Sequence, residues 1–273
     1  MKPRNWNDLM NSAFAGQKFL CVGLDPVYEK IPHRLKSNRN HRDDMRAVES
    51  FCIEIIQAVG STAGFLKPNW AFFLQFGTEG LLILEEVIRY SKSEYPDMAI
   101  ILDCKVGDIG TTNAAYARCF FDQLGADAIT MHGYLGRQAN QTFLDHANKG
   151  FFVLCHTSNP GAEEFQRLRV DEDQRLYQKL AGRVQHHWNA NRNCGLVAGA
   201  TFPDALRSIR NTAPSLPLLV PGIGTQGGDL QAAVTAAKDS HGAGFIINAA
   251  SSIIFADDPR AAASTLDEKI RAM

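Results

Sequence analysis

The chain has 273 residues, of which 45% are hydrophobic and 21% are charged, as is ordinary for a globular protein. Its 28 Lys and Arg nearly balance its 29 Asp and Glu, so the formal net charge is −1 and there is no basic footprint typical of a nucleic-acid-binding protein. No apolar run approaches the roughly 18 residues of a membrane span. The first ten residues contain no apolar stretch typical of a secretory signal.

The six cysteines are scattered, and none forms a CxxC pair, which argues against a zinc site or a redox motif. Four of them lie in or beside apolar, strand-like runs. Such positions suit small buried hydrophobic side chains in a reducing compartment. We therefore expect a cytoplasmic protein with neither nucleic acid nor membrane as a partner.

Eight short apolar runs recur along the chain, at residues 19–24, 64–69, 99–106, 128–133, 151–157, 195–200, 217–223 and 244–250. Continuous apolar runs of this length are typical of buried parallel strands. Segments with helical spacing lie between them, among them 45–56, 72–90, 114–124, 173–188 and 230–238. The alternation predicts βαβ units, and eight of them favour a single (β/α)8 TIM barrel domain over residues 1–273. An open doubly wound sheet is the alternative, although no GxGxxG follows the first run.

In such a barrel, functional side chains lie at the carboxyl ends of the strands. The polar residues at or just past the predicted strand ends are Asp25, Lys67, Asn69, Asp103, Lys105, Asp108, His132, Thr157, Ser158, Thr201, Gln226 and Asn248.

Four of these residues form a charged pattern. Asp103 and Lys105 are two apart on one predicted strand and therefore point to the same face. Adjacent strands lie about 4.8 Å apart, so Lys67 on the preceding strand can reach Asp103. With Asp108 they predict an alternating Lys–Asp–Lys–Asp array, in which the carboxylates keep each lysine protonated and able to donate a proton. A structural salt-bridge network at the barrel rim is the alternative.

The motif formed by Asp103, Lys105, Asp108, Ile109 and Thr112 resembles the signature of orotidine 5′-phosphate decarboxylases. Further motifs of this family are matched in order, at residues 23–26, 65–69, 157–162 and 221–228. The resemblance covers nearly the whole chain, and the variants at 67–69 and 157–162 are similar to those of the longer bacterial members.

The resemblance implies decarboxylation of orotidine 5′-monophosphate to uridine 5′-monophosphate in de novo pyrimidine synthesis, without a cofactor or a metal. It implies that Lys105 donates a proton to C6 of the pyrimidine as carbon dioxide leaves. It places Asp103 beside the departing carboxylate, Lys67 against the ribose and Asp103, and Asp25 against the ribose hydroxyls.

The resemblance also implies a homodimer in which Asp108, Ile109 and Thr112 enter the site of the partner subunit. Ser158 is then expected to hydrogen-bond the pyrimidine amide, and Gln226 to bridge the pyrimidine and the phosphate.

The glycine-rich segment 222–228 is a candidate phosphate site. Residues without a Cβ, such as Gly224 and Gly227, let backbone N–H groups approach an anion closely. A helix predicted from about Asp229 presents its positive end, and barrels often bind phosphate after strands 7 and 8. A tight turn that requires glycine is the alternative.

One position departs from the family pattern. The resemblance implies a phosphate-binding arginine where Ser251 stands, and no arginine lies between Arg210 and Arg260. A serine brings neither a charge nor a bidentate fork. We therefore expect phosphate binding to be weaker by about 2–5 kcal/mol, unless another basic residue compensates.

Two other functions stay open. A metal-dependent sugar-phosphate decarboxylase of the same suprafamily shares the D-x-K-x-x-D pattern, but it typically carries an acidic residue where Lys67 stands. A catalytically impaired nucleotide-binding barrel is the second.

The polar segment 163–173 and residues 225–228 are candidate lids that exclude water from the site.

Overall fold

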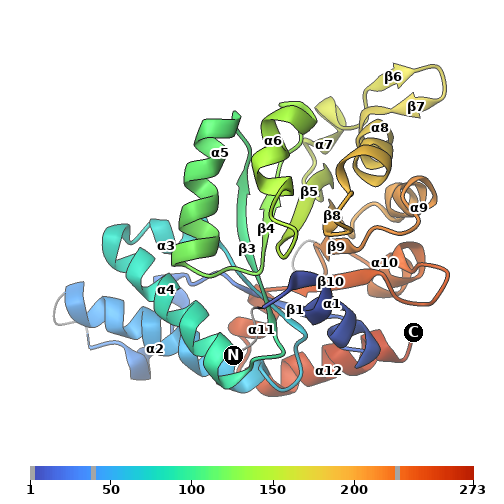
Figure 1. The fold of residues 1–273 in the computed structure, drawn as a ribbon. Coiled ribbons are helices and arrows are strands. Elements are labelled where there is room, and N and C mark those ends of the chain that lie inside the picture. Colours follow the sequence, from blue (N-terminus) through green and yellow to red (C-terminus); the bar gives the residue numbers. More distant parts are fainter. Residues whose placement is uncertain (1–3, 38–40, 225–227) are drawn as a thin grey trace.

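The computed structural model describes residues 4–37, 41–224 and 228–273, and its centre is a closed barrel of eight parallel strands (Figure 1). Around the barrel the strands follow the order β1-β10-β9-β8-β5-β4-β3-β2. They are β1 (Leu20–Leu24), β2 (Phe65–Pro68), β3 (Ala99–Val106), β4 (Ala128–Met131), β5 (Gly150–His156), β8 (Cys194–Ala198), β9 (Leu218–Pro221) and β10 (Phe245–Ala249). Each strand overlaps the apolar run that predicted it, so the predicted (β/α)8 barrel is confirmed.

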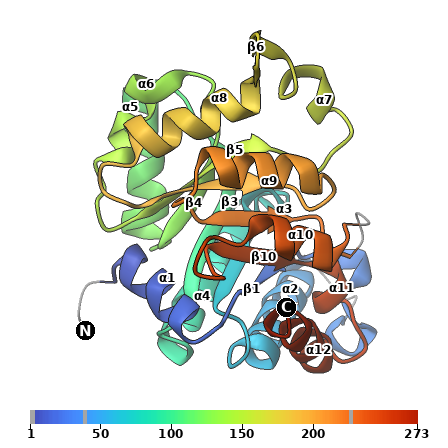
Figure 2. The same cartoon turned by 90° about the vertical axis from the view of Figure 1, so that its right-hand side faces the viewer.

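Helices connect successive strands and form the outer layer, as Figures 1 and 2 show from two sides. The α-helices are α1 (Trp6–Ala15), α2 (His41–Val59), α3 (Trp70–Leu74), α4 (Gly77–Glu94), α5 (Gly110–Ala117), α6 (Gly136–Leu144), α7 (Ala162–Phe165), α8 (Leu176–Arg183), α9 (Pro203–Thr212), α10 (Leu230–Ala237), α11 (Ser251–Ile254) and α12 (Pro259–Arg271). Two 3₁₀ turns, η1 (Tyr28–Lys30) and η2 (His33–Leu35), follow β1, and two π-helical segments, η3 (Arg118–Gln123) and η4 (Val184–Trp188), extend α5 and α8.

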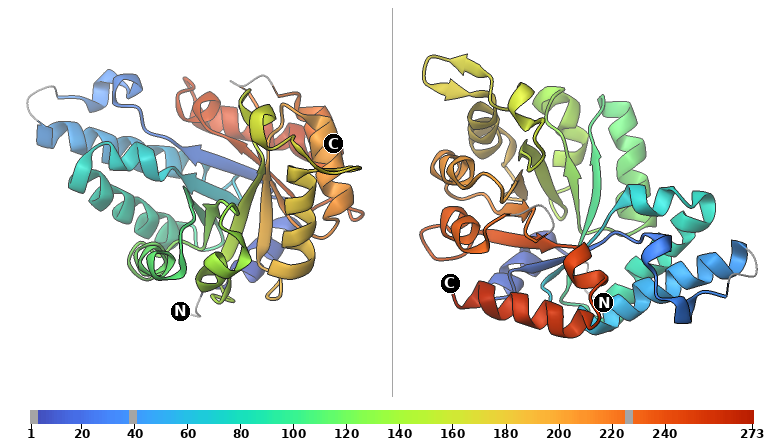
Figure 3. Two further views of the ribbon diagram at one scale, coloured as in Figure 1. Left: turned by 90° about the horizontal axis from the view of Figure 1, so that it is seen from above. Right: turned by 180° about the vertical axis from the view of Figure 1, so that it is seen from behind.

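The barrel is packed with side chains at the end where its strands begin. Helix α1 closes that end, and its Trp6 packs edge-on against Phe152 with ring centroids 5.4 Å apart. Gly150, the first residue of β5, lies so close to Trp6 that a Cβ there would come within 2.5 Å of the indole. Among the described residues, the cavity lies at the other end of the barrel, where the strands end. Figure 3 shows the barrel and its helices from two further sides.

The register of the strands places polar side chains at this end of the barrel. Successive side chains of a strand point to opposite faces, so Phe65 and Lys67 of β2 both point into the barrel. Phe65 packs in the core at the closed end of the barrel. Lys67, two residues closer to the carboxyl end of the strand, lines the cavity. The parallel pairing of β1 with β10 matches Cys21 with Asn248, which brings the loops after these two strands together.

Two predicted helices begin or break differently in the structure. The helix predicted at 72–90 is divided into α3 and α4, because Gly77 adopts a left-handed φ of +67° and the chain turns there. The helix predicted at 173–188 begins only at Leu176, because the preceding residues form a hairpin. This hairpin, β6 (Arg169–Asp171) with β7 (Gln174–Arg175), projects away from the barrel in Figure 1.

None of the helices in residues 4–37, 41–224 and 228–273 is both long enough and apolar enough to cross a membrane.

Candidate active site

A cavity of about 730 Å³ opens at the carboxyl ends of the barrel strands. Its polar and charged lining comes from nearly every strand end. These residues are Asp25, Lys30, Lys67, Asn69, Asp103, Lys105, Thr130, Thr157, Ser158, Asn159, Gln166, Asn248 and Ser251. Six of the predicted site residues are therefore brought together in one cavity: Asp25, Lys67, Asp103, Lys105, Ser158 and Ser251.

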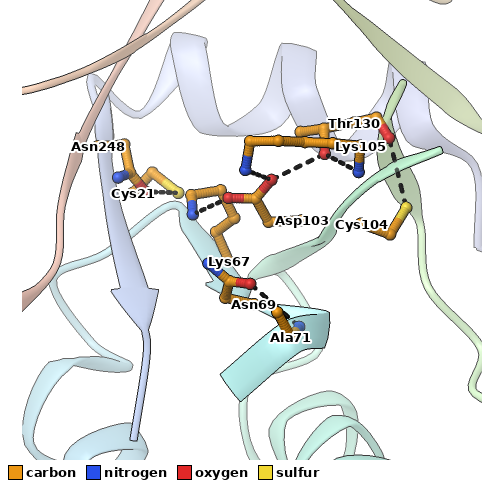
Figure 4. Close-up of polar contacts among 9 residues, drawn as sticks. All are labelled: Cys21, Lys67, Asn69, Ala71, Asp103, Cys104, Lys105, Thr130 and Asn248. Carbon is orange, nitrogen blue, oxygen red and sulfur yellow. Dashed lines mark hydrogen bonds and ion pairs between the residues drawn. The ribbon is translucent and has the colours of Figure 1, made fainter. Parts of the chain in front are cut away.

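Asp103 stands at the centre of the charged array at the base of this cavity (Figure 4). One of its carboxylate oxygens lies 2.7 Å from Lys67 Nζ, and the other lies 2.5 Å from Lys105 Nζ. The Thr130 hydroxyl also donates to the second oxygen, at 2.8 Å. The predicted contact between Lys67 and Asp103 is confirmed by this ion pair.

Burial and the two ammonium groups act in opposite directions on these charges. Burial would raise the pKa of the Asp103 carboxyl, but the charges of Lys67 and Lys105 outweigh it and hold that pKa well below its usual value. Burial would likewise lower the pKa of Lys67, but Asp103 and then Asp25 raise it above its usual value. Asp103 is therefore a fixed anion and Lys67 a fixed cation at neutral pH.

Lys105 differs from Lys67 because its side chain is 49% exposed, and it reaches into the open part of the cavity. Its backbone has a φ of +47°, a left-handed conformation that few residues other than glycine adopt. The ladder between β3 and β4 is irregular here, and the Lys105 N–H donates to the Thr130 hydroxyl at 3.0 Å instead. Local backbone strain thus aims the ammonium group at the cavity rather than along the strand.

Asp25 supplies a second carboxylate at the same base. Its Oδ1 atom is buried and has no hydrogen-bond partner among the described residues, although buried oxygens are normally paired. Burial raises the pKa of this carboxyl, and the nearby Lys67 lowers it. An unpaired acceptor in a cavity is suited to bind a hydroxyl group of a ligand.

Residues 18–266 match the model of the orotidine 5′-phosphate decarboxylase / HUMPS family. The chain belongs to this family. It is 43% identical to an orotidine 5′-phosphate decarboxylase of Janthinobacterium sp. (strain Marseille), over 87% of this chain and 84% of that protein. The solved OMP decarboxylase of Leishmania donovani has a TM-score of 0.86 and 40% identity, covering 98% of both chains. The UMP synthase of the same organism has a TM-score of 0.89 and 41% identity, but this chain spans only 56% of it. The family resemblance predicted from the sequence is confirmed.

In this member of the orotidine 5′-phosphate decarboxylase family, the loop after β5 is held by Gln166. The Gln166 amide oxygen accepts from the Thr157 N–H at 2.7 Å, and its amide nitrogen donates to the Thr157 hydroxyl at 2.8 Å. These bonds fix the residue preceding Ser158, which itself lines the cavity. Gln166, in the polar segment after β5, thus holds the first residues of that segment against the cavity wall.

The predicted phosphate end of this decarboxylase-family site is described in part. Ser251 lines the cavity, and Gly224 adopts a φ of +91°, which only glycine tolerates readily. Gly224 does not itself line the cavity. Gln226 and Gly227 lie outside the described residues.

Asp108, Ile109 and Thr112 do not line the cavity of their own chain, so the array there contains three of the four predicted charges. The Asp108 carboxylate accepts from the N–H of Ile109 at 2.6 Å, and the N–H of Asp108 donates to the side chain of Asn113 at 2.9 Å. Ile109 is 58% exposed, so its apolar side chain is open to contact with another surface.

Three polar cavity residues belong neither to the predicted strand-end residues nor to the family motifs: Lys30, Thr130 and Gln166. Thr130 had a usable signal, because it is the one polar residue in the apolar run of β4 and alternates inward with Ala128. Lys30 and Gln166 follow their strands by several residues, and no spacing rule singles them out. His132, the histidine among the predicted strand-end residues, does not line the cavity.

Proposed function

We propose that the protein decarboxylates orotidine 5′-monophosphate to uridine 5′-monophosphate in pyrimidine synthesis. The observation that carries this proposal is the array of Lys67, Asp103 and Lys105 at the base of the cavity. A fully buried ion pair that carries a second, cavity-facing ammonium is expensive to build for stability alone. Membership in the orotidine 5′-phosphate decarboxylase / HUMPS family gives the array its reaction class.

In the proposed reaction, the bond between C6 of the pyrimidine and its carboxylate breaks, and carbon dioxide leaves with the electron pair remaining on C6. Asp103, a fixed anion, lies beside the substrate carboxylate and is relieved of its repulsion when carbon dioxide departs. The Lys105 ammonium stabilises the charge that develops on C6 and then donates its proton there. Solvent afterwards returns a proton to the lysine through the open cavity.

Other cavity residues orient the substrate in this proposal. Lys67 contacts the ribose while it holds Asp103, and the unpaired oxygen of Asp25 accepts from a ribose hydroxyl. Ser158 hydrogen-bonds the pyrimidine amide, and Gln226 bridges the pyrimidine and the phosphate. Gly224 and Gly227 shape the loop that receives the phosphate.

The proposed reaction needs neither a metal nor a cofactor. Turnover of orotidine 5′-monophosphate by extensively dialysed protein in the presence of EDTA, followed by the ultraviolet absorbance of the pyrimidine, tests it. We expect turnover at the same rate with and without EDTA. Loss of turnover in EDTA that added metal restores would refute the proposal and favour a metal-dependent decarboxylase. Nucleotide binding without any turnover would favour the non-catalytic alternative.

We also propose a homodimer in which Asp108, Ile109 and Thr112 complete the partner's site. Their absence from the cavity of their own chain and the exposure of Ile109 support this arrangement. The six cysteines are all free thiols, which suits the proposed cytoplasmic location, and recovery of activity from the cytoplasmic fraction of cells would test it.

Mixing two inactive variants tests the shared site. If Lys105→Ala and Asp108→Asn subunits exchange, each mixed dimer has one site with both residues intact. Random pairing in a twofold dimer then restores about one quarter of the sites. Activity should rise when the two variants are mixed and exchanged under conditions that dissociate the dimer. If every mixture stays inactive although mixed dimers form, the two residues act in the same subunit.

Ser251 is proposed to weaken the binding of the substrate phosphate, because serine carries no charge and offers a single donor. Ser251→Arg should raise kcat/KM for orotidine 5′-monophosphate by at least about 30-fold, as a gain of 2 kcal/mol or more implies. Most of the gain should be a lower KM. Ser252→Arg, one residue further along α11, is the matched control and should give no gain. An unchanged kcat/KM in Ser251→Arg would show that the phosphate does not lie at this position.

A further inference from the structure

The cavity has three cationic side chains among its described lining residues: Lys30, Lys67 and Lys105. Lys67 and Lys105 both pair with Asp103 and are committed to the base of the cavity. Lys30 forms no ion pair with any residue in the described ranges. Among the described lining residues, it is therefore the one ammonium group that is not paired with a carboxylate.

Lys30 lies on the side of the cavity that also carries Ser251. It ends the turn η1 after β1, and β1 pairs with β10, the strand that leads into α11. The ends of these strands are in close contact, because a Cβ on Gly23 would come within 2.7 Å of the Cβ of Ala250. Asp103 is on β3, which is separated from β10 by two other strands around the barrel.

The ring of Phe255 holds the Lys30 ammonium group near α11. Lys30 Nζ lies 5.4 Å from the centroid of this ring, within the range of a cation–π contact. The Phe255 N–H donates to the backbone oxygen of Ser251 at 3.3 Å. Phe255 therefore lies one helical turn after Ser251. Phe255 is itself fixed by stacking on Phe51, with ring centroids 5.5 Å apart and planes at 9°.

Lys30 also borders a second, outer cavity with two acidic residues, Glu54 and Asp257. Glu54 is already engaged, because both of its carboxylate oxygens accept from the guanidinium of Arg34. Asp257 also lines this outer cavity, but it is not joined to Lys30 by an ion pair. The charge of Lys30 thus remains available to an anionic group inside the main cavity.

We propose that Lys30 binds the phosphate group of the substrate and supplies the positive charge that Ser251 lacks. The inference rests on the proposed function, because it requires a substrate with a phosphate at the end of the cavity remote from Asp103. A lysine is a point charge without the bidentate fork of arginine. Lys30 therefore compensates in part, and the gain expected from Ser251→Arg remains.

Lys36 offers a matched control in the same connection between β1 and α2. Its ammonium group also lies over an aromatic ring, that of Tyr28, at 4.8 Å from the centroid, and it donates to the backbone oxygen of Glu29 at 3.1 Å. Lys36 does not line the cavity. Lys36→Ala removes the same charge and a comparable ring contact without touching the substrate.

The test compares kcat/KM for orotidine 5′-monophosphate and for orotidine, which lacks the phosphate, in Lys30→Ala, Lys30→Arg, Lys36→Ala and wild-type protein. For Lys30→Ala we expect the value for the phosphorylated substrate to fall about 10- to 100-fold, mainly through KM, as for loss of a charged hydrogen bond. The value for orotidine should stay unchanged. Lys30→Arg should preserve activity, and Lys36→Ala should match the wild type.

Two results would overturn the role of Lys30. One is an unchanged kcat/KM for orotidine 5′-monophosphate in Lys30→Ala, and the other is an equal loss with both substrates, which would indicate a structural role. Failure of the wild-type protein to turn over its substrate would refute the proposed function separately. In that case calorimetric titration with uridine 5′-monophosphate and with uridine tests the role of Lys30. We expect Lys30→Ala to bind uridine 5′-monophosphate about 10- to 100-fold more weakly than the wild type and to bind uridine equally well. No binding of the nucleotide to wild-type protein would overturn both proposals.

Discussion

Lys105→Ala should reduce kcat for orotidine 5′-monophosphate by about 10⁴- to 10⁷-fold. The lysine is proposed to do two things at once, to stabilise charge on C6 and to donate the proton. Fixed electrostatic stabilisation is worth about 10²- to 10³-fold and general acid catalysis about 10²- to 10⁴-fold. Its ammonium is the cavity-facing end of the array, 2.5 Å from Asp103. Steady-state turnover measured by ultraviolet absorbance, with enough enzyme to detect slow rates, gives the result.

Lys105→Gly provides the control for folding. Both variants lose the ammonium group, but glycine tolerates the φ of +47° at this position and alanine does not. Lys105→Gly should therefore be equally inactive and yet more stable than Lys105→Ala by about 1 kcal/mol in chemical denaturation. Substantial activity in both variants would contradict the role of Lys105. Equal stability of the two would contradict the backbone strain.

Asp103→Asn should lower both activity and stability. The carboxylate pairs with two ammonium groups, one of them buried, and asparagine leaves Lys67 without its ion-pair partner. Removing one partner of a buried ion pair costs about 3–5 kcal/mol of unfolding free energy. We expect kcat/KM to fall by at least about 10²- to 10³-fold, as for loss of one fixed charge at a reacting centre.

The stability effect has a definite pH dependence. Because the pKa of Asp103 is depressed in the folded protein, its ionised form contributes stability above the unfolded pKa, near 4, and this contribution is lost as the pH falls further. The difference in unfolding free energy between wild type and Asp103→Asn should be constant between pH 5 and 7, because Asp103 is ionised there in both the folded and the unfolded chain. The difference should shrink below about pH 4. Urea denaturation at a series of pH values measures it.

Asp127→Asn separates stability from catalysis. Asp127 is as buried as Asp103 and pairs with Arg4 at 2.8 Å, but it precedes β4 at the closed end of the barrel. Its replacement should cost a comparable amount of unfolding free energy and leave kcat/KM at the wild-type value. If Asp103→Asn is destabilised like Asp127→Asn and keeps full activity, the array is only a structural salt bridge.

The barrel was predictable because each strand is a continuous apolar run, and the reach of Lys67 to Asp103 followed from the period of a strand and the spacing between strands. The strain at Lys105 was not predictable. Its neighbours in β3 include no glycine or other residue that signals a left-handed turn, and the conformation depends on Thr130 in the next strand. Contacts of this kind come from tertiary packing, which overrides local preference.

Other parts of the site have no local pattern in the sequence that would predict them. Asp108 and Thr112 stand at the expected point of the sequence but do not line the cavity of their own chain, and the proposed dimer is what would bring them to a site. Lys30 lies on the same side of the cavity as Ser251 because β1 and β10 are neighbours in the closed barrel. That neighbour relation joins residues more than 200 positions apart and has no local pattern in the sequence.

A crystal structure of the protein with uridine 5′-monophosphate bound tests the central claim most directly, because it places the reacting carbon against the array. We predict that C6 of the pyrimidine lies about 3–3.5 Å from Lys105 Nζ, the distance of a reactive approach. The ribose should then contact Lys67 and Asp25, and the phosphate should lie near Ser251. A nucleotide bound with its pyrimidine away from Lys105, or bound outside this cavity, would contradict the account.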